Sequence, residues 1–265
     1  MEQTSILVDS RGCEFGYELI MVLPFVYWLH SQNKDVAVVT CQHMKDFYFF
    51  LTKDKCIEKY KSRTDIIPPG LPLKGIHFEN LDTDKWEVPN FREFYSSFDL
   101  PFTTTKPILL VSNKYTQEWK NAPVNFIPLQ VLNQIFTKLK DTYQIVYNRP
   151  HSNKITVDTQ RHYEFGDYEL IKDKHPEVIN LNNVETRLNY NLLQLIIGSK
   201  TSKFISVQGG SSILSSLFGG TNIILAKKGS ELKFNSYNWY SKFSGASILW
   251  SQKDDIFLEK IFNTY

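Results

Sequence analysis

The chain has 265 residues, of which 42% are hydrophobic and 22% are charged, and its formal net charge is only +2. This composition excludes a disordered chain, because disorder requires low hydrophobicity and high net charge. The 30 basic residues face 28 acidic ones without a dense basic block, which argues against a dedicated nucleic-acid binder. A chain of this length can bury a large core without disulfides or a structural metal.

The three cysteines, Cys13, Cys41 and Cys56, form no C-x-x-C pair. This pattern is typical neither of a disulfide framework nor of a zinc site, so we expect free thiols in a reducing, cytoplasmic setting. The N-terminus lacks a basic region followed by a cleavable apolar run. The longest apolar run, residues 19–29, is shorter than the roughly 20 residues that span a bilayer, so we predict no transmembrane segment.

The first hundred residues open with the pattern of a βαβ unit. An apolar run at residues 6–8 leads into a polar, glycine-bearing loop at residues 9–16. The long apolar segment 17–30 predicts a buried helix, and the β-branched run 36–40 predicts a strand parallel to the first. Further on we predict a helix at 45–51, a strand at 75–78, and a Pro-rich linker at 82–106 with a short helix at 91–97.

The alternation of strands and helices restarts near residue 107. Strands are predicted at 108–111, 144–147, 178–181, 204–207, 222–225 and 248–250, and helices at 129–139, 191–198, 213–218 and 254–262. We therefore predict an α/β fold of two facing Rossmann-like domains, each a doubly wound parallel sheet. Their expected bounds are residues 1–105 and 106–252, with a closing helix at 253–265.

Four loops directly follow predicted strands, at residues 9–16, 112–114, 148–151 and 208–212. In open α/β sheets ligands bind beyond the carboxyl ends of the strands, so we expect these loops to line one cleft. The stretch Gln208-Gly209-Gly210-Ser211-Ser212 can bring a phosphate close to the backbone at a helix start. A plain strand-to-helix turn with serine as the cap fits it equally well, and it matches neither a Walker A loop nor G-x-G-x-x-G.

Carboxylates and cations stand in the same loops. Asp9, Glu14 and Glu18 are candidates to accept a proton from a sugar hydroxyl, although Glu14 and Glu18 also suit a helix N-terminus. Arg149 offers a planar fork for diphosphate oxygens, and Lys114 offers a point charge or is simply a solvated surface cation.

No metal or nucleophile motif stands out in the sequence. The six histidines form no H-x-x-x-H or H-E-x-x-H pair, and no G-x-S-x-G elbow occurs. Asp82 and Asp84 spell D-x-D, but they do not follow a predicted strand. We therefore predict no metal site and no cofactor.

These features together resemble the GT-B class of glycosyltransferases, which has two facing Rossmann-like domains. The resemblance rests on Arg11-Gly12-Cys13-Glu14-Phe15-Gly16, on the restart at Ile108-Leu109-Leu110-Val111, and on Ser206-Val207-Gln208-Gly209-Gly210-Ser211-Ser212. It implies transfer of a sugar from a nucleotide-diphosphate sugar to a hydroxyl of a glycan or glycoconjugate, generally without a metal. Gln208 stands where heptosyltransferase-like members usually carry an acid, and the H-x-R-x-G-D sequence of some fucosyltransferases is missing.

The resemblance also implies roles for individual residues. Glu14 would be the base, with Asp9 and Glu18 as alternates. The donor would be held by residues from both halves of the chain, namely Gly12, Lys114, Arg149, Gln208, Gly209, Gly210, Ser211 and Ser212. Two alternatives remain open: a non-catalytic nucleotide- or glycan-binding module, and a sugar-nucleotide epimerase of the same architecture.

Overall fold

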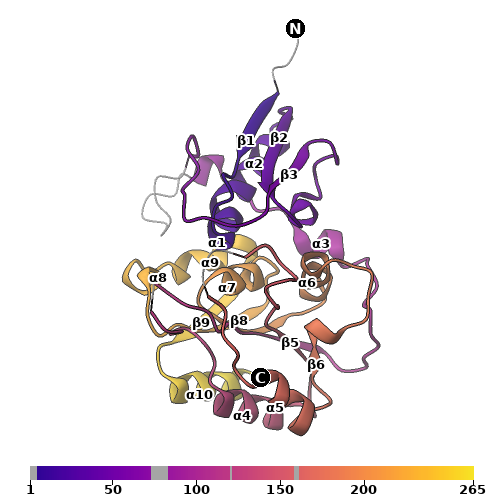
Figure 1. The fold of residues 1–265 in the computed structure, drawn as a ribbon, viewed down its shortest axis with the longest axis vertical. Helices are drawn as coiled ribbons and strands as arrows, with labels where there is room; N and C mark the ends of the chain where they lie inside the picture. The colour runs from indigo at the N-terminus through magenta and orange to yellow at the C-terminus, as the bar shows by residue number, and fades with distance from the viewer. Residues whose placement is uncertain (1–4, 73–82, 120, 158–160) are drawn as a thin grey trace.

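The fold contains two parallel β-sheets stacked along the long axis of the molecule (Figure 1). The computed structural model describes all residues except 1–4, 73–82, 120 and 158–160. The predicted strand at 75–78 and Asp82 of the D-x-D sequence lie outside the described residues.

The first sheet has the order β1-β2-β3, and its strands are all parallel. Strands β1 (Ile6–Asp9) and β2 (Val36–Cys41) confirm the predicted ones, whereas β3 (Cys56–Tyr60) was not predicted. The helix predicted at 17–30 is continuous but irregular, because a π-helical stretch interrupts it. Its parts are α1 (Phe15–Tyr17), the π-helix η1 (Glu18–Val22) and α2 (Leu23–Ser31). The helix expected at 45–51 is a short 3-10 turn, η2 (Lys45–Tyr48).

The second sheet is a complete doubly wound sheet with the order β6-β5-β4-β7-β8-β9. Its six strands are parallel, and each overlaps a predicted strand: β4 (Ile108–Ser112), β5 (Gln144–Asn148), β6 (Ile179–Asn180), β7 (Lys203–Val207), β8 (Thr221–Leu225) and β9 (Ser247–Ser251). The chain order reverses between β4 and β7, which is the switch point where such sheets form a ligand crevice.

Helices cover both faces of the second sheet (Figure 1). On the face away from the first sheet, α4 (Leu129–Leu139), α5 (Asp167–Lys174) and α10 (Asp254–Thr264) bury an apolar core. On the other face lie α6 (Tyr190–Ser199), α7 (Gly210–Ser216) and α9 (Tyr237–Ser244), whose core continues into the first half of the chain. The remaining short helices are η3 (Thr83–Lys85), α3 (Phe91–Tyr95), η4 (Leu181–Asn183) and α8 (Ser230–Lys233).

The two halves touch closely where α1 meets α7. A Cβ atom added at Gly210 would lie only 2.6 Å from Cδ1 of Phe15, and one added at Gly16 would lie 3.1 Å from Cδ1 of Ile213. Glycine at both positions therefore lets the helices approach, and the loops after β1 and β7 are brought face to face.

The segment around α3 ties the halves together from the other side. Trp86 Nε1 donates to Ile20 O in the first half at 2.7 Å. A few residues later, the Arg92 guanidinium donates to the carbonyls of Ser199, Thr201 and Phe218, at the ends of α6 and α7. These bonds supply partners for carbonyls that a helix C-terminus leaves unpaired.

Candidate functional site

A cleft of about 160 Å³ lies between the halves, at the carboxyl ends of β1, β4, β5 and β7. The first half contributes Glu14, Phe15 and Arg63 to its walls, and the second half contributes Lys114, Arg149 and Ser211 among others. The expectation that loops after several strands line one cleft therefore agrees with the geometry.

Glu14 reaches the cleft because the chain turns sharply just before it. Arg11 and Gly12 have positive φ angles of 54° and 67°, and a Cβ at Gly12 would lie 3.2 Å from Ser62 O. Glu14 then has the extended conformation of a helix N-cap, with ψ of 145°, and its carbonyl accepts from Glu18 N at 2.9 Å. Gly12 itself does not line the cleft, so its role is to make the turn.

The other two candidate carboxylates lie outside the cleft. Asp9 accepts from Tyr60 Oη at 2.7 Å and from Arg11 N at 2.8 Å. Glu18 has no exposed surface, and its carboxylate accepts from Thr40 Oγ1, from Tyr48 Oη at 3.0 Å and from Arg63 Nη1 at 2.7 Å. Both carboxylates are thus engaged by the protein, and Glu18 is inaccessible to a substrate.

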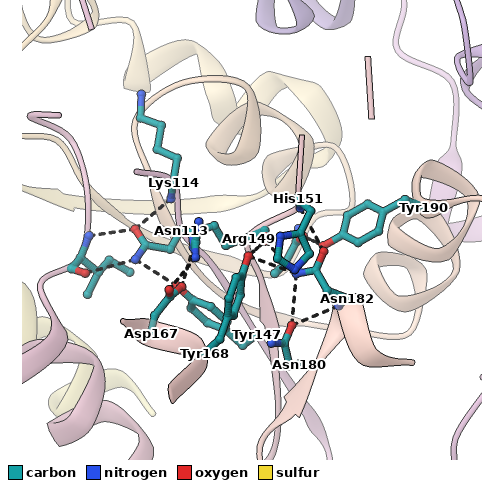
Figure 2. A network of polar contacts seen from close by, with 12 residues as sticks. Asn113, Lys114, Tyr147, Arg149, His151, Asp167, Tyr168, Asn180, Asn182 and Tyr190 are labelled. Atoms are coloured by element: carbon teal, nitrogen blue, oxygen red, sulfur yellow. Dashed lines mark hydrogen bonds and ion pairs between the residues drawn. The ribbon is translucent and has the colours of Figure 1, made fainter. Parts of the chain in front are cut away.

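Lys114 lies at the switch point, directly after β4. Its backbone N donates to Asn113 Oδ1 at 2.9 Å, and Asn113 is held in turn by Ile127 and Tyr147 (Figure 2). The Lys114 ammonium lies 3.4 Å from Glu118 Oε2 and would lie 3.3 Å from a Cβ placed on Gly209. The ammonium group therefore stands over the glycine turn that follows β7.

Arg149 sits in a network of polar contacts that fixes its orientation (Figure 2). Its Nε and Nη2 bond Asp167 at 2.5 and 2.6 Å, and Tyr147 Oη donates to the same carboxylate at 2.5 Å. The Arg149 carbonyl accepts from Tyr168 Oη and Asn182 Nδ2, and the guanidinium lies 4.1 Å from the Tyr168 ring centroid. Burial alone would lower the pKa of Arg149, but Asp167 outweighs it and raises that pKa. Arg149 lines the cleft, and Asp167 already occupies the edge of the guanidinium formed by Nε and Nη2.

The glycine-serine loop divides into residues that face the cleft and residues that do not. Gly210 and Ser211 line it, and Gly209 has a φ of 117° that an L side chain rarely adopts. Ser212 is fully buried and donates to Gly209 O at 2.8 Å. Gln208 is buried, and its amide donates to Glu231 Oε2 at 2.7 Å. Gln208 and Ser212 therefore hold the turn in shape.

The sequence reasoning missed several residues of the cleft. Arg63 follows the unpredicted strand β3, and Thr116 and His162 come from the long loops after β4 and β5, which pair with each other. Thr156 and Val157 of the second loop also line the cleft and bond back to the first half, at Gln42 O and Arg63 N. No local periodicity marks these loop residues.

Two negative findings apply to the described part of the chain. Within it, no group of three His, Cys, Asp or Glu side chains is arranged to hold a metal ion. Nor does any helix there have the length and apolar character needed to cross a membrane.

The fold is similar to that of a solved structure described as the glycosyl transferase family 9 from Veillonella parvula DSM 2008. The TM-score is 0.57 at 12% sequence identity, and the alignment covers 100% of this chain and 91% of that chain. No protein-family model and no curated protein matches the chain. The likeness confirms the distant resemblance to glycosyltransferases at the level of the fold.

Proposed function

We propose that the protein is a glycosyltransferase of the GT-B type, which moves a sugar from a nucleotide-diphosphate sugar to a hydroxyl of a glycan or glycoconjugate. One observation carries the proposal: a carboxylate from the first half, Glu14, and a cation from the second, Lys114, line the same cleft at the carboxyl ends of parallel strands. Group transfer needs a proton acceptor on one side of the reacting carbon and a stabilised leaving group on the other.

The donor side of the cleft suits a diphosphate. Lys114 supplies a positive charge, Ser211 a hydroxyl, and the Gly209-Gly210 turn a backbone that a ligand can approach closely. Arg149 contributes through its Nη1 side, since Nε and Nη2 are bonded to Asp167. Fixed donors of this kind stabilise the negative charge that develops on the departing diphosphate.

The acceptor side is assigned to Glu14. Its carboxylate takes the proton of the acceptor hydroxyl as that oxygen bonds to the anomeric carbon. The bond from this carbon to the diphosphate oxygen breaks at the same centre, and the electron pair leaves with the nucleoside diphosphate. Asp9 and Glu18 are not part of this proposal, because neither lines the cleft. No metal is required by the scheme, and the three free thiols suit a cytoplasmic location.

The first test is a thermal-shift panel of nucleoside diphosphates. A ligand at about 100 times its dissociation constant adds about 2.7 kcal/mol of stability, which shifts the melting temperature measurably. Lys114→Met removes a charge-assisted contact of about 1.5–3 kcal/mol. It should therefore raise the dissociation constant of the nucleoside diphosphate about 10- to 150-fold.

The second test separates a transferase from a binding module. Glu14→Gln should lower turnover of a sugar nucleotide by about 10²–10⁴ while leaving nucleoside diphosphate affinity unchanged. Glu259→Gln, on the exposed side of α10, is the matched control and should behave like the wild type. A protein that binds a sugar nucleotide but neither transfers nor hydrolyses its sugar would favour the binding module.

A further inference from the structure

Arg63 and Glu18 form a buried ion pair beside the cleft. Their side chains are 3% and 0% exposed, and Nη1 of Arg63 lies 2.7 Å from Oε2 of Glu18. Taking two charges out of water costs several kcal/mol per ion, and apolar residues of similar size are often as stable or more so. A pair of this kind is therefore explained poorly by stability alone, and its other contacts show what it does.

The same Arg63 nitrogen also binds the peptide group between Cys13 and Glu14. Nη1 also donates to Cys13 O at 2.7 Å, and this carbonyl shares its peptide plane with the Glu14 N–H. Next to it, Thr64 N donates to Gly12 O at 2.7 Å, and the guanidinium lies 5.2 Å from the Phe15 ring centroid. Residues 12–15 are thus held from one side by Arg63 and its neighbour in the chain.

Glu18 fixes the arginine from the opposite direction. Its two carboxylate oxygens are occupied by Thr40, Tyr48 and Arg63, so it cannot rotate toward the cleft. Glu18 N also donates to Glu14 O, so the backbones of Glu14 and Glu18 are bonded directly to each other. Among the described residues Arg63 Nε is buried without a hydrogen-bond partner, whereas Nη1 donates to both Glu18 and Cys13.

Arg63 also reaches the opposite wall. Its backbone N donates to Val157 O at 2.9 Å, and Val157 lines the cleft from the second half. One residue therefore contacts the loop that carries the proposed base and a second loop that also lines the cleft.

We propose that Arg63 is a positioning residue that holds Glu14 at the acceptor side of the cleft, with Glu18 as the anchor of Arg63. This inference rests on the proposed function, because it takes Glu14 as the base. A misplacement of about 1 Å at a reacting group costs about 10²-fold in rate, so loss of the pair should act on turnover while donor binding persists.

The test uses the double variant Arg63→Met/Glu18→Gln, which leaves no lone buried charge. Its matched control is Lys55→Met/Asp35→Asn, an ion pair of 3.0 Å that precedes β3 and β2 and lies at the strand ends away from the cleft. We expect the kcat for the sugar nucleotide found in the panel to fall about 10²-fold in the Arg63 variant, with an unchanged KM for that donor. The control variant should keep the kcat of the wild type.

A second readout follows the loop without turnover. Cys13 is fully buried, and burial raises the pKa of its thiol. In a Cys41→Ala/Cys56→Ala background, the Arg63 variant should react faster with a thiol reagent under native conditions than the control variant does. Equal labelling rates, or a normal kcat in the Arg63 variant when Glu14→Gln is inactive, would overturn the inference and leave the proposed function intact. If Glu14→Gln itself turns over normally, the assignment of the base fails first.

Discussion

The bidentate pair between Arg149 and Asp167 predicts that removing the arginine alone destabilises the protein more than removing both partners together. The Arg149 side chain is 9% exposed and that of Asp167 is 0% exposed, with contacts of 2.5 and 2.6 Å. Arg149→Met leaves the Asp167 carboxylate buried without its cation, and breaking a buried pair in this way costs about 3–5 kcal/mol. For a chain of this size, that loss lowers the melting temperature by about 6–20 °C.

The double variant Arg149→Met/Asp167→Asn should be more stable than Arg149→Met alone. The second substitution removes the lone charge, and the new amide oxygen can still accept from Tyr147 Oη. Thermal unfolding followed by circular dichroism on the wild type, both single variants and the double variant completes the cycle. A double variant no more stable than Arg149→Met would refute the reasoning, as would Arg149→Met melting at the wild-type temperature. Nucleotide affinity is measured separately, at a temperature where every variant is folded.

Three further predictions concern other parts of the molecule. Gly220 and Gly245 have similar φ angles of 75° and 73°, but a Cβ at Gly220 would lie 2.3 Å from Ser202 O and one at Gly245 would meet nothing within 4 Å. Gly245→Ala should cost about 1–2 kcal/mol in denaturant unfolding, and Gly220→Ala about 1–3 kcal/mol more; equal losses would contradict the close approach. Burial lowers the pKa of His175 below its ordinary 6.5, although Glu177 opposes this, so the unfolded state binds more protons near that pH. The unfolding free energy should therefore decrease as the pH falls from 7.5 through about 6.5, and less so in His175→Gln; parallel pH profiles would exclude this cause. Turnover should survive EDTA, and loss that Mn²⁺ or Mg²⁺ restores would show that a metal takes part.

The sequence predicted the second sheet well because its central strands are buried on both faces. Such strands appear as mainly apolar runs, as in Ile108–Ser112 and residues 204–207. Strand β3 escaped prediction because it mixes the exposed Ile57 with charged Glu58 and Lys59. β3 is held in the sheet by its pairing with β2 on one side, and no local sequence pattern indicates such a pairing.

The sequence predicted that the loops after the strands line one cleft, but it did not predict which of their carboxylates face that cleft. Glu14 and Glu18 are four residues apart, a spacing that would put both on one helix face. They separate because Glu14 is an N-cap with extended ψ, whereas Glu18 lies inside the helical segment and faces Thr40 and Tyr48. Arg63 is 45 residues from Glu18, and such a distant pairing leaves no periodic trace in the chain.

The hydrogen bonds of Arg92 to the second half determine where the chain can be divided to exchange the halves between proteins. Trp86 and Glu87 still bond to the first half, at Ile20 O and Pro24 O, whereas Arg92 already caps carbonyls of the second. A chimera joined at residue 106 would carry α3 into a foreign context and leave three carbonyls without their arginine, at about 1–3 kcal/mol for each that is buried and unpaired. A junction between Pro89 and Asn90 keeps the bonds of Trp86, Glu87 and Arg92 within their own halves, whereas the contacts of α3 with Asp46, Phe47 and Phe49 would then join the exchanged parts.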